Sequence, residues 1–379
     1  MIPIALPLLD GEEGEAARRT VLSGWLSQGP QVAAFEQEFA TLMGASHACA
    51  VSNCTTALHL ALRAVGIGPG DEVITASHSF IASANSIRYC GATPVFVDID
   101  PATYNVDPER VAEAITGRTR AILIVHQMGM PCDLAALTAL ADRHQIPLIE
   151  DAACAAGSQI RIGGRWDSIG APHGRIACFS FHPRKVITTG EGGMLTTSDA
   201  DLDRRFKLLR QHGMSVPDTV RHGSPQVIFE DYLEVGFNYR MTDMQAAIGR
   251  KQLERLKDIV SRRRALAALY AELLGNIEGL SLPFEPEWAR SNWQSYCVRL
   301  PDRVDQRAVM QSLLDQGIAT RRGIMCAHRE PPYAHEKPRH DLRQSELAQD
   351  RAILLPIYAQ MVEEDQVRVA EALKTTLMN

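Results

Sequence analysis

Lys185 has an unusual setting for a charged residue. It lies in SFHPRKVITTGEGG, residues 180–193, where its neighbours are mainly apolar residues, proline and glycine. A lysine that is partly desolvated loses proton affinity and becomes a nucleophile that can form a Schiff base with a carbonyl group. A solvated surface position is the alternative for any single lysine, so this segment alone leaves both interpretations open.

Asp151 follows the apolar run IPLIE and is expected at the carboxyl end of a buried strand. Open α/β sheets usually bind their ligands at this edge. A buried carboxylate also needs a partner, because unpaired burial is costly. An arginine or a helix N-terminus would serve, and so would a cationic ring nitrogen.

A phosphate site is expected in VSNCTTALHLAL, residues 51–62, where a strand-like run ends in Ser, Asn and Thr before an apolar helix. Free amides and the helix dipole attract anions at such a turn. Thr55 and Thr56 are therefore candidate phosphate ligands, and an ordinary helix cap is the alternative.

The three features together indicate pyridoxal 5'-phosphate. This cofactor requires a phosphate cradle, a carboxylate that keeps its ring nitrogen protonated and a lysine for its aldehyde. P-loop, zincin and nucleophile-elbow motifs do not occur in the sequence. The histidines at 328, 335 and 340 lack partners with metal-ligand spacing, so no metal site is predicted.

The elements that must position these residues alternate between strand and helix over the first 200 residues. Strand-like runs are expected at 47–53, 71–77, 93–100, 119–127, 146–153, 175–181 and 192–197, with helix-like runs at 55–66, 79–91 and 133–145. Such alternation predicts a mainly parallel sheet with helices on both faces.

A long helix is predicted from about residue 242 to 275, because helical spacing persists there for more than 25 residues. The remaining sequence mixes a strand-like run at 295–300 with helix-like runs at 306–317 and 363–377. We therefore predict a large cofactor-binding α/β domain at 1–250 and a small α+β domain at 251–379.

Composition excludes several other classes of protein. The 379 residues carry a formal net charge of −6 without a long basic run, which argues against nucleic acid or an anionic membrane as partner. The eight cysteines contain no C-x-x-C pair and indicate reduced thiols. Because neither a signal peptide nor an apolar run of about 18 residues is present, a cytoplasmic location is expected.

Seven stretches of the sequence resemble the DegT/StrS-type sugar aminotransferases, which are pyridoxal-phosphate enzymes of aspartate-aminotransferase-like fold. They are SGWLSQGPQVAAFEQEFA, VSNCTTALHLAL, GDEVITASHSFIASANSIRYCGATPVFVDID, IPLIEDAACAAGS, CFSFHPRKVITTGEGGMLTT, GFNYRMTDMQAAIGRKQLERL and LLPIY. The resemblance covers nearly the whole chain. It implies the type I fold of these transferases, with a mostly parallel mixed central sheet flanked by helices and a smaller C-terminal domain.

The resemblance also implies the roles of the central residues. Lys185 would form the internal aldimine and transfer a proton between the substrate carbon and the cofactor. Asp151 would pair with the pyridinium nitrogen, and Phe80 would stack on the ring. Some relatives carry histidine in place of the lysine and dehydrate sugars, so the presence of Lys185 favours transamination.

Phosphate binding is implied for residues from two subunits. Thr55, Thr56 and Ser180 match the phosphate ligands of the family. Asn238 and Arg240, in FNYR, match residues that reach the cofactor phosphate of the neighbouring subunit. A homodimer with shared active sites is therefore expected.

Two cysteines depart from the usual pattern of the family. Cys54 stands where Gly usually precedes the phosphate threonine, and Cys154 stands where Gln or His usually lies beside the phenolic oxygen of the cofactor. A thiol is a weak hydrogen-bond donor, so both positions bear on the cofactor's electronic state.

The resemblance implies L-glutamate as amino donor and a nucleotide-linked keto sugar as acceptor, most often a 4-keto-6-deoxy hexose. Candidate substrate contacts are Arg321, Arg322, His328 and Tyr333, which lie in ATRRGIMCAHREPPY. A sugar dehydratase and a non-catalytic sensor that retains the fold are the alternatives.

Overall fold

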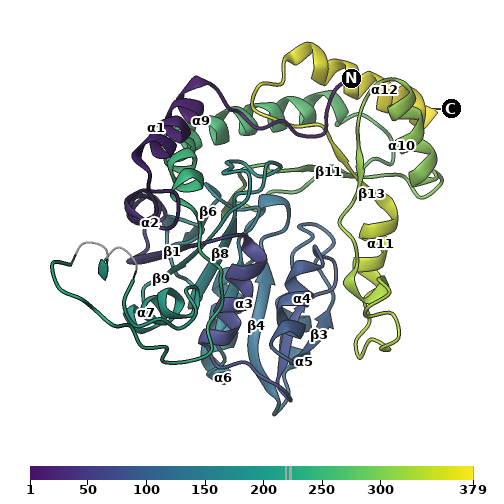
Figure 1. The fold of residues 1–379 in the computed structure, drawn as a ribbon. Helices are drawn as coiled ribbons and strands as arrows, with labels where there is room; N and C mark the ends of the chain where they lie inside the picture. Colours follow the sequence, from purple (N-terminus) through teal and green to yellow (C-terminus); the bar gives the residue numbers. More distant parts are fainter. Residues whose placement is uncertain (218–219, 222–223, 379) are drawn as a thin grey trace.

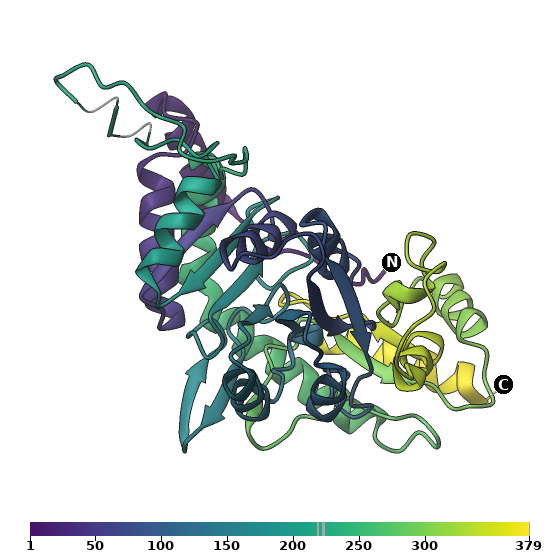
Figure 2. The same cartoon turned by 90° about the horizontal axis from the view of Figure 1, so that it is seen from below.

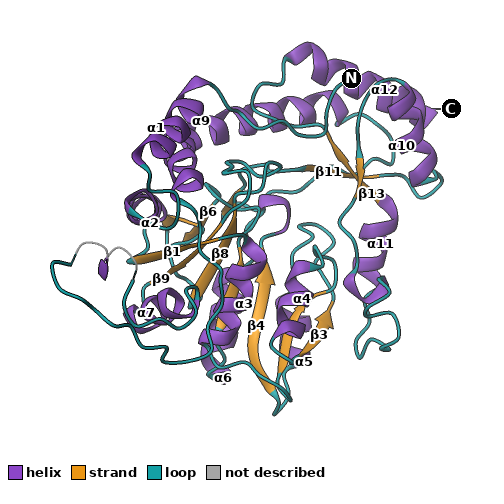
Figure 3. Cartoon of the chain, in the orientation of Figure 1, coloured by secondary structure: helices purple, strands orange, loops and turns teal. Residues whose placement is uncertain are grey.

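The computed structural model describes residues 1–217, 220–221 and 224–378. Its central sheet has seven strands in the order β1-β9-β8-β5-β4-β2-β3 (Figures 1 and 3). They are β1 His47–Val51, β2 Glu72–Ala76, β3 Thr93–Val97, β4 Thr119–Val125, β5 Leu148–Asp151, β8 Ile176–Ser180 and β9 Gly193–Thr197. Strands β3, β2, β4, β5 and β8 pair in parallel, and β9 is antiparallel to both β8 and β1. The predicted, mostly parallel sheet is confirmed.

Helices cover both faces of this sheet (Figure 3). The helices of the first 210 residues are α1 Gly11–Ser23, α2 Pro30–Met43, α3 Cys54–Ala64, α4 Ala82–Tyr89, α5 Pro108–Ala114, α6 Leu134–His144 and α7 Ala200–Leu209, with a short 3-10 turn, η1, at Gln127–Gly129. In β4, Ile122 and Ile124 face one hydrophobic cluster, whereas Ala121 and Leu123 face another. Burial on both faces explains why the strands read as continuous apolar runs.

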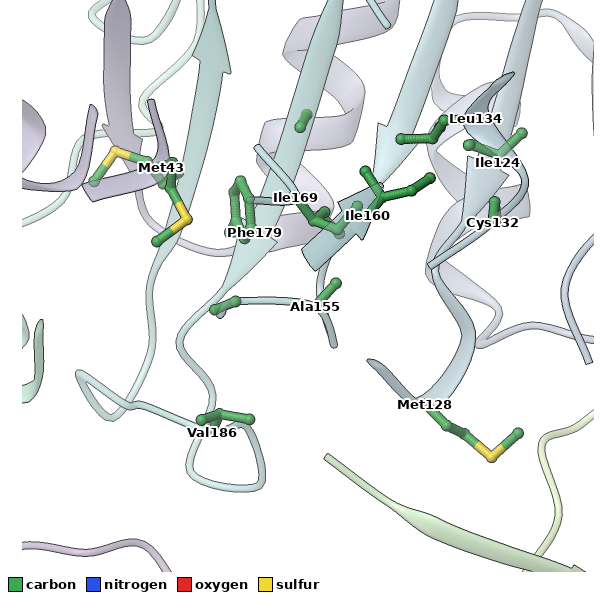
Figure 4. Packing of buried hydrophobic residues seen from close by; sticks show 14 of the residues in the cluster. Met43, Ile124, Met128, Cys132, Leu134, Ala155, Ile160, Ile169, Phe179 and Val186 are labelled. Carbon is green, nitrogen blue, oxygen red and sulfur yellow. The ribbon is translucent and has the colours of Figure 1, made fainter. Parts of the chain in front are cut away.

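The loop that carries Lys185 is anchored in this core at both ends. Phe179 and Phe181 precede the loop, Val186 and Ile187 follow the lysine, and all four side chains are buried. Figure 4 shows Val186 on the loop below β8 and Phe179 on the strand itself. Anchoring on both sides holds the backbone of Lys185 in one place.

A small sheet was not predicted from the sequence. It consists of β6 Gln159–Ile162, β7 Arg165–Ser168 and β10 Ala289–Arg290. The β6–β7 turn is made by Gly163 and Gly164, whose φ angles of 58° and 82° are positive. The strands have at most four residues and β7 is polar, so their pattern is too short to be recognised.

The predicted long helix is confirmed as α9, Asp243–Leu274, which has 32 residues. It begins at a capping box between Thr242 and Gln245 and packs against α1 and α2 at one end and α12 near the other (Figure 1). Residue 250, where we predicted the domain boundary, lies inside this continuous helix.

The second domain is built on a three-stranded antiparallel sheet in the order β11-β13-β12. Its elements are α10 Gln306–Asp315, α11 Arg343–Arg351, α12 Glu363–Met378, η2 Ala327–Arg329, β11 Tyr296–Arg299, β12 Arg321–Arg322 and β13 Ala352–Leu355. The first residues of the chain belong to this unit, because Ile2 forms a parallel bridge with Ile318 and is buried. No helix within the described ranges is long and apolar enough to cross a membrane.

A buried ion pair protects the outer edge of the central sheet. The N–H of Ala50 in β1 donates to Glu36 Oε1 at 2.8 Å, and Arg210 Nη1 donates to the carbonyl of Ala50 at 2.7 Å. Glu36 and Arg210 also pair with each other and are both buried. The pair thus occupies backbone groups that an edge strand would otherwise leave open.

We predict that Arg210→Met lowers the free energy of unfolding by about 3–5 kcal/mol, because it leaves the Glu36 charge buried without its partner. The double variant Glu36→Gln/Arg210→Met should be less destabilised, since the amide still accepts from Ala50 and carries no charge. Urea unfolding of the three proteins measures both effects. Equal losses in the single and double variants would contradict this explanation.

Candidate active site

A cavity of about 620 Å³ lies at the carboxyl ends of the parallel strands, between the central sheet and the second domain. Both domains and the N-terminal residues Ile4 and Ala5 contribute to its walls. Most of the predicted site residues line it, namely Cys54, Thr55, Thr56, Phe80, Asp151, Cys154, Ser180, Lys185 and Arg321. The packing of the second domain against this sheet edge therefore brings together residues that are far apart in the chain, from Cys54 to Arg321.

Lys185 points into this cavity. Its Nζ donates to Cys154 Sγ at 3.1 Å, and its backbone N–H donates to the His182 carbonyl at 2.8 Å. Burial alone would lower the pKa of the Lys185 ammonium, but the Cys154 sulfur and the Asp151 carboxylate outweigh it and the net shift is upward. The sequence argument anticipated a lysine that loses proton affinity, and the neighbouring sulfur and carboxylate reverse that direction.

Asp151 is buried at the end of β5 with both carboxylate oxygens hydrogen-bonded. Ser83 Oγ donates to Oδ2 at 2.8 Å, and the N–H of Ala153 donates to Oδ1 at 3.1 Å. Burial raises the pKa of the Asp151 carboxyl, and Ser83, Ala153 and Lys185 oppose this shift. A protonated ring nitrogen beside this carboxylate would supply the positive charge that its burial calls for.

The N-terminus of α3 fits a phosphate group. Asn53 caps the helix by accepting from the N–H of Thr56 at 3.0 Å, and the Thr56 hydroxyl donates to the Asn53 carbonyl at 2.7 Å. In the described part of the chain, the N–H groups of Cys54 and Thr55 and the Thr55 hydroxyl have no hydrogen-bond partner. Gly193 makes room for this turn, because a Cβ there would lie 2.5 Å from the Asn53 backbone.

Phe80 also lines the cavity and is 62% exposed. The preceding segment is tied to the second domain, since Ser79 N–H donates to Met325 O at 3.1 Å and Ala327 N–H donates to Ser77 O at 2.8 Å. An exposed aromatic ring on a fixed backbone at a cavity wall suits the face of a planar cofactor ring. The lysine, carboxylate, helix N-terminus and aromatic face together fit pyridoxal phosphate.

Sequence comparison assigns the chain to a family. The model of the DegT/DnrJ/EryC1/StrS aminotransferase family matches residues 7–374. The chain belongs to this family. It is a pyridoxal-phosphate-dependent sugar aminotransferase, as the resemblance of its seven stretches implied.

Individual relatives match over their whole length. The chain is 42% identical over 381 residues to GDP-perosamine synthase of Caulobacter vibrioides, covering 100% of this chain and 98% of that protein. It is 39% identical over 382 residues to spore coat polysaccharide biosynthesis protein SpsC of Bacillus subtilis, covering 98% and 96%. The solved structure of DesV from S. venezuelae, in complex with a ketimine intermediate, matches with a TM-score of 0.89 and 35% identity, covering 100% and 99%. Other solved neighbours are in PLP-form and PMP-form, and pyridoxal phosphate is the cofactor.

Two predicted phosphate ligands of this sugar aminotransferase lie outside the cavity. Asn238 is exposed and forms a bridge with Gln211, and Arg240 is half-buried and forms a bridge with Val51 at the end of β1. Within the described residues, neither side chain has a hydrogen bond or ion pair. This placement leaves both side chains available to a neighbouring molecule.

Three of the predicted substrate contacts also do not line the cavity. Arg322 pairs with Glu330, at 3.3 Å. His328 is buried, with Nδ1 2.6 Å from Ser77 Oγ and Nε2 3.1 Å from Glu346 Oε1. Tyr333 is buried too, and its hydroxyl donates to Asn85 Oδ1 at 2.8 Å. His328 and Tyr333 therefore join the second domain to the large domain, Arg322 is paired within the second domain, and only Arg321 of the four faces the cavity.

Sequence reasoning missed the residues that brace the loops of Cys154 and Lys185. Asn292 is fully buried and donates through Nδ2 to the carbonyls of Cys154 and Ala156, both at 2.8 Å. Gln294 Nε2 donates to the carbonyl of Arg184 at 3.0 Å. Both braces come from the segment between β10 and β11, so they depend on how the domains pack. The sequence holds no local signal for such contacts.

Arg263 of α9 fixes the bracing segment itself. Its Nη1 donates to the carbonyls of Trp293, Gln294 and Ile357, at 2.9, 3.3 and 3.3 Å. Trp293 has a positive φ of 52°, which is uncommon for a non-glycine residue. Burial lowers the pKa of Arg263 to about 10, which shows how strongly desolvated this guanidinium is.

We predict that Ser83→Ala moves the acidic limb of the kcat/KM profile to higher pH. Ser83 opposes the rise in the pKa of Asp151, so its loss raises that pKa further and the carboxylate is protonated at a higher pH. Ser86→Ala is the control, because the buried Ser86 hydroxyl donates to the carbonyl of Ser83 and not to Asp151. An unchanged acidic limb in Ser83→Ala would contradict this role.

Proposed function

We propose that this enzyme moves the amino group of L-glutamate to the ketone of a nucleotide-linked sugar. The acceptor that we propose is a 4-keto-6-deoxy hexose. The observation that carries the proposal is that one cavity contains the Lys185 ammonium, the buried Asp151 carboxylate and the N-terminus of α3 with its N–H groups that are unpaired among the described residues. The identity to GDP-perosamine synthase supports a nucleotide-linked acceptor. The wall contributed by Ile4, Ile324 and Leu355 is apolar and suits a C6 methyl group better than a hydroxymethyl group.

The residues of the chain have separate tasks in this proposal. Asp151 holds the positive ring nitrogen of the cofactor, and Lys185 Nζ holds its aldehyde and later moves the proton at the substrate carbon. Cys154 Sγ, 3.1 Å from Lys185 Nζ, lies beside that proton path. When bound, pyridoxal phosphate supplies the electron sink and the carrier of the amino group.

We assign phosphate binding to a part of the cavity wall that the large domain contributes. Cys54, Thr55 and Thr56 present the α3 N-terminus, and Ser180 adds a hydroxyl at the end of β8. In this proposal the Cys54 backbone N–H binds phosphate. Burial and the nearby Asp151 charge raise the pKa of the Cys54 thiol well above its ordinary value, so the thiol stays neutral beside the carboxylate.

The transfer of nitrogen tests the reaction. We predict that the holoenzyme loses its yellow colour when L-glutamate labelled with nitrogen-15 is added, and regains it with one member of a panel of nucleotide-linked keto sugars. The label should appear in the product sugar, as mass spectrometry would show. Lys185→Ala should slow the transfer by about 10³-fold or more, because both carbonyl capture and proton transfer lose their group.

The alternatives give different products in the same experiment. A dehydratase would remove a hydroxyl from the sugar and leave no labelled nitrogen on it. A sensor would bind the cofactor and leave glutamate unchanged. Either result would overturn the aminotransferase reaction proposed here.

We further propose a homodimer in which Asn238 and Arg240 complete the phosphate site of the partner. The segment before α9 extends away from the sheet, as Figure 2 shows at the upper left. Its apolar residues Phe229, Leu233 and Val235 are 89%, 65% and 86% exposed. Such exposure is unusual for a monomer and favours burial against a second copy.

Subunit mixing tests the shared site. Lys185→Ala and Arg240→Ala should each be nearly inactive alone. A hybrid dimer contains one site with both native residues, so random mixing of the two variants should restore about one quarter of the wild-type activity. Activity that stays at the level of the separate variants would show that Arg240 acts within its own subunit or has no part in the site.

A further inference from the structure

Arg184 is a cation in the cavity that the proposed reaction does not use. It directly precedes Lys185 in the chain, lines the same cavity and is exposed. Among the described residues it has no ion pair and its guanidinium makes no hydrogen bond. Several other exposed arginines of the chain, such as Arg18, Arg110 and Arg175, are paired with carboxylates.

The backbone of Arg184 is held in place although its side chain is free. Its N–H donates to His182 Nδ1 at 3.2 Å, and its carbonyl accepts from Gln294 Nε2 at 3.0 Å. Arg184 and Lys185 have adjacent Cα atoms, about 3.8 Å apart, yet the lysine is directed at Cys154 while the arginine is exposed at the cavity wall. The guanidinium therefore lies on the solvent side of the reacting group.

Arg321 provides a second free guanidinium from the second domain. It lies in β12 next to Arg322, and successive strand residues point to opposite faces. Arg322 pairs with Glu330, whereas Arg321 lines the cavity without an ion pair among the described residues. The cavity thus has two uncompensated guanidinium groups, one on each domain.

We propose that Arg184 and Arg321 together bind the diphosphate of the nucleotide-linked sugar. This inference rests on the proposed function and adds to it a specific residue, Arg184, and the part of the substrate that it recognises. The reacting ketone must approach Lys185, and the diphosphate is attached at the other side of the same sugar ring. The guanidinium of Arg184, on the solvent side of Lys185, and that of Arg321, in the wall of the same cavity, match two adjacent phosphates, which arginine recognises by paired hydrogen bonds.

The carboxylate of Glu191 also lines the cavity and is exposed. Since Asp151 is assigned to the ring nitrogen, Glu191 is the remaining acidic group among the described residues of the lining. Lys185 is assigned to the cofactor as well, so the guanidiniums of Arg184 and Arg321 remain against the single carboxylate of Glu191 in the lining. The cavity therefore keeps an excess of positive charge for an anionic substrate.

Nucleotide binding to the holoenzyme tests the inference without catalysis. The probes are GDP and dTDP, with guanosine and thymidine as phosphate-free controls, measured by calorimetry. For whichever diphosphate binds the wild-type enzyme more tightly, Arg184→Ala should raise Kd about 10- to 100-fold, since a hydrogen bond to a charged group is lost. The Kd of Arg184→Lys should lie between those of the wild-type enzyme and Arg184→Ala, because lysine keeps the charge but cannot form the paired hydrogen bonds.

A surface control separates local binding from a general loss of charge. Arg165→Ala removes the same charge from the β6–β7 hairpin, where the side chain is 81% exposed and outside the cavity. It should leave Kd for the diphosphate unchanged. An equal rise of Kd in both variants, an unchanged Kd in Arg184→Ala, or no binding of either diphosphate to the wild-type enzyme would overturn the inference.

Separate half-reactions distinguish the two anionic substrates. The glutamate half-reaction, followed by loss of the cofactor colour, should keep its rate and its glutamate dependence in Arg184→Ala. A slower glutamate half-reaction with unchanged diphosphate binding would assign Arg184 to a glutamate carboxylate and overturn our proposal. If the wild-type enzyme transfers no nitrogen, the proposed reaction fails, while the diphosphate titration still decides the role of Arg184.

Discussion

Burial of the Asp151 carboxylate is the constraint on which the site depends. A charge at this depth is tolerated because Ser83 and the Ala153 backbone donate to it and Lys185 lies in the same cavity. Each of these groups comes from a different loop or helix at the sheet edge. The parallel strands place those loops at one edge, and the same packing that buries the carboxylate directs the lysine into the same cavity.

Local patterns predicted much of the large domain. Apolar runs marked the strands because each is buried on both faces, and Asn53 with Thr56 marked the start of α3 as a capped helix. Asp151 and Lys185 could be singled out because a strand end and a glycine-rich loop are visible in the sequence itself. These features depend on neighbours within a few residues.

Features that depend on contacts between distant segments could not be predicted in the same way. His328 and Tyr333 were expected at the substrate, but Ser77 and Asn85 of the large domain bind their polar atoms. Asn292 and Ser83 look like ordinary polar residues until the fold brings them to Cys154 and Asp151. A sequence shows that a residue is polar, whereas the fold decides what it contacts.

The first residues of the chain have a practical consequence for work with this enzyme. Ile2 pairs with Ile318 and is buried, and Ile4 and Ala5 form part of the cavity wall. Met378, in contrast, is 77% exposed at the end of α12. Shortening the chain at its start would therefore remove part of the cavity wall and a bridge of the second domain, whereas an affinity tag after α12 would follow an exposed residue.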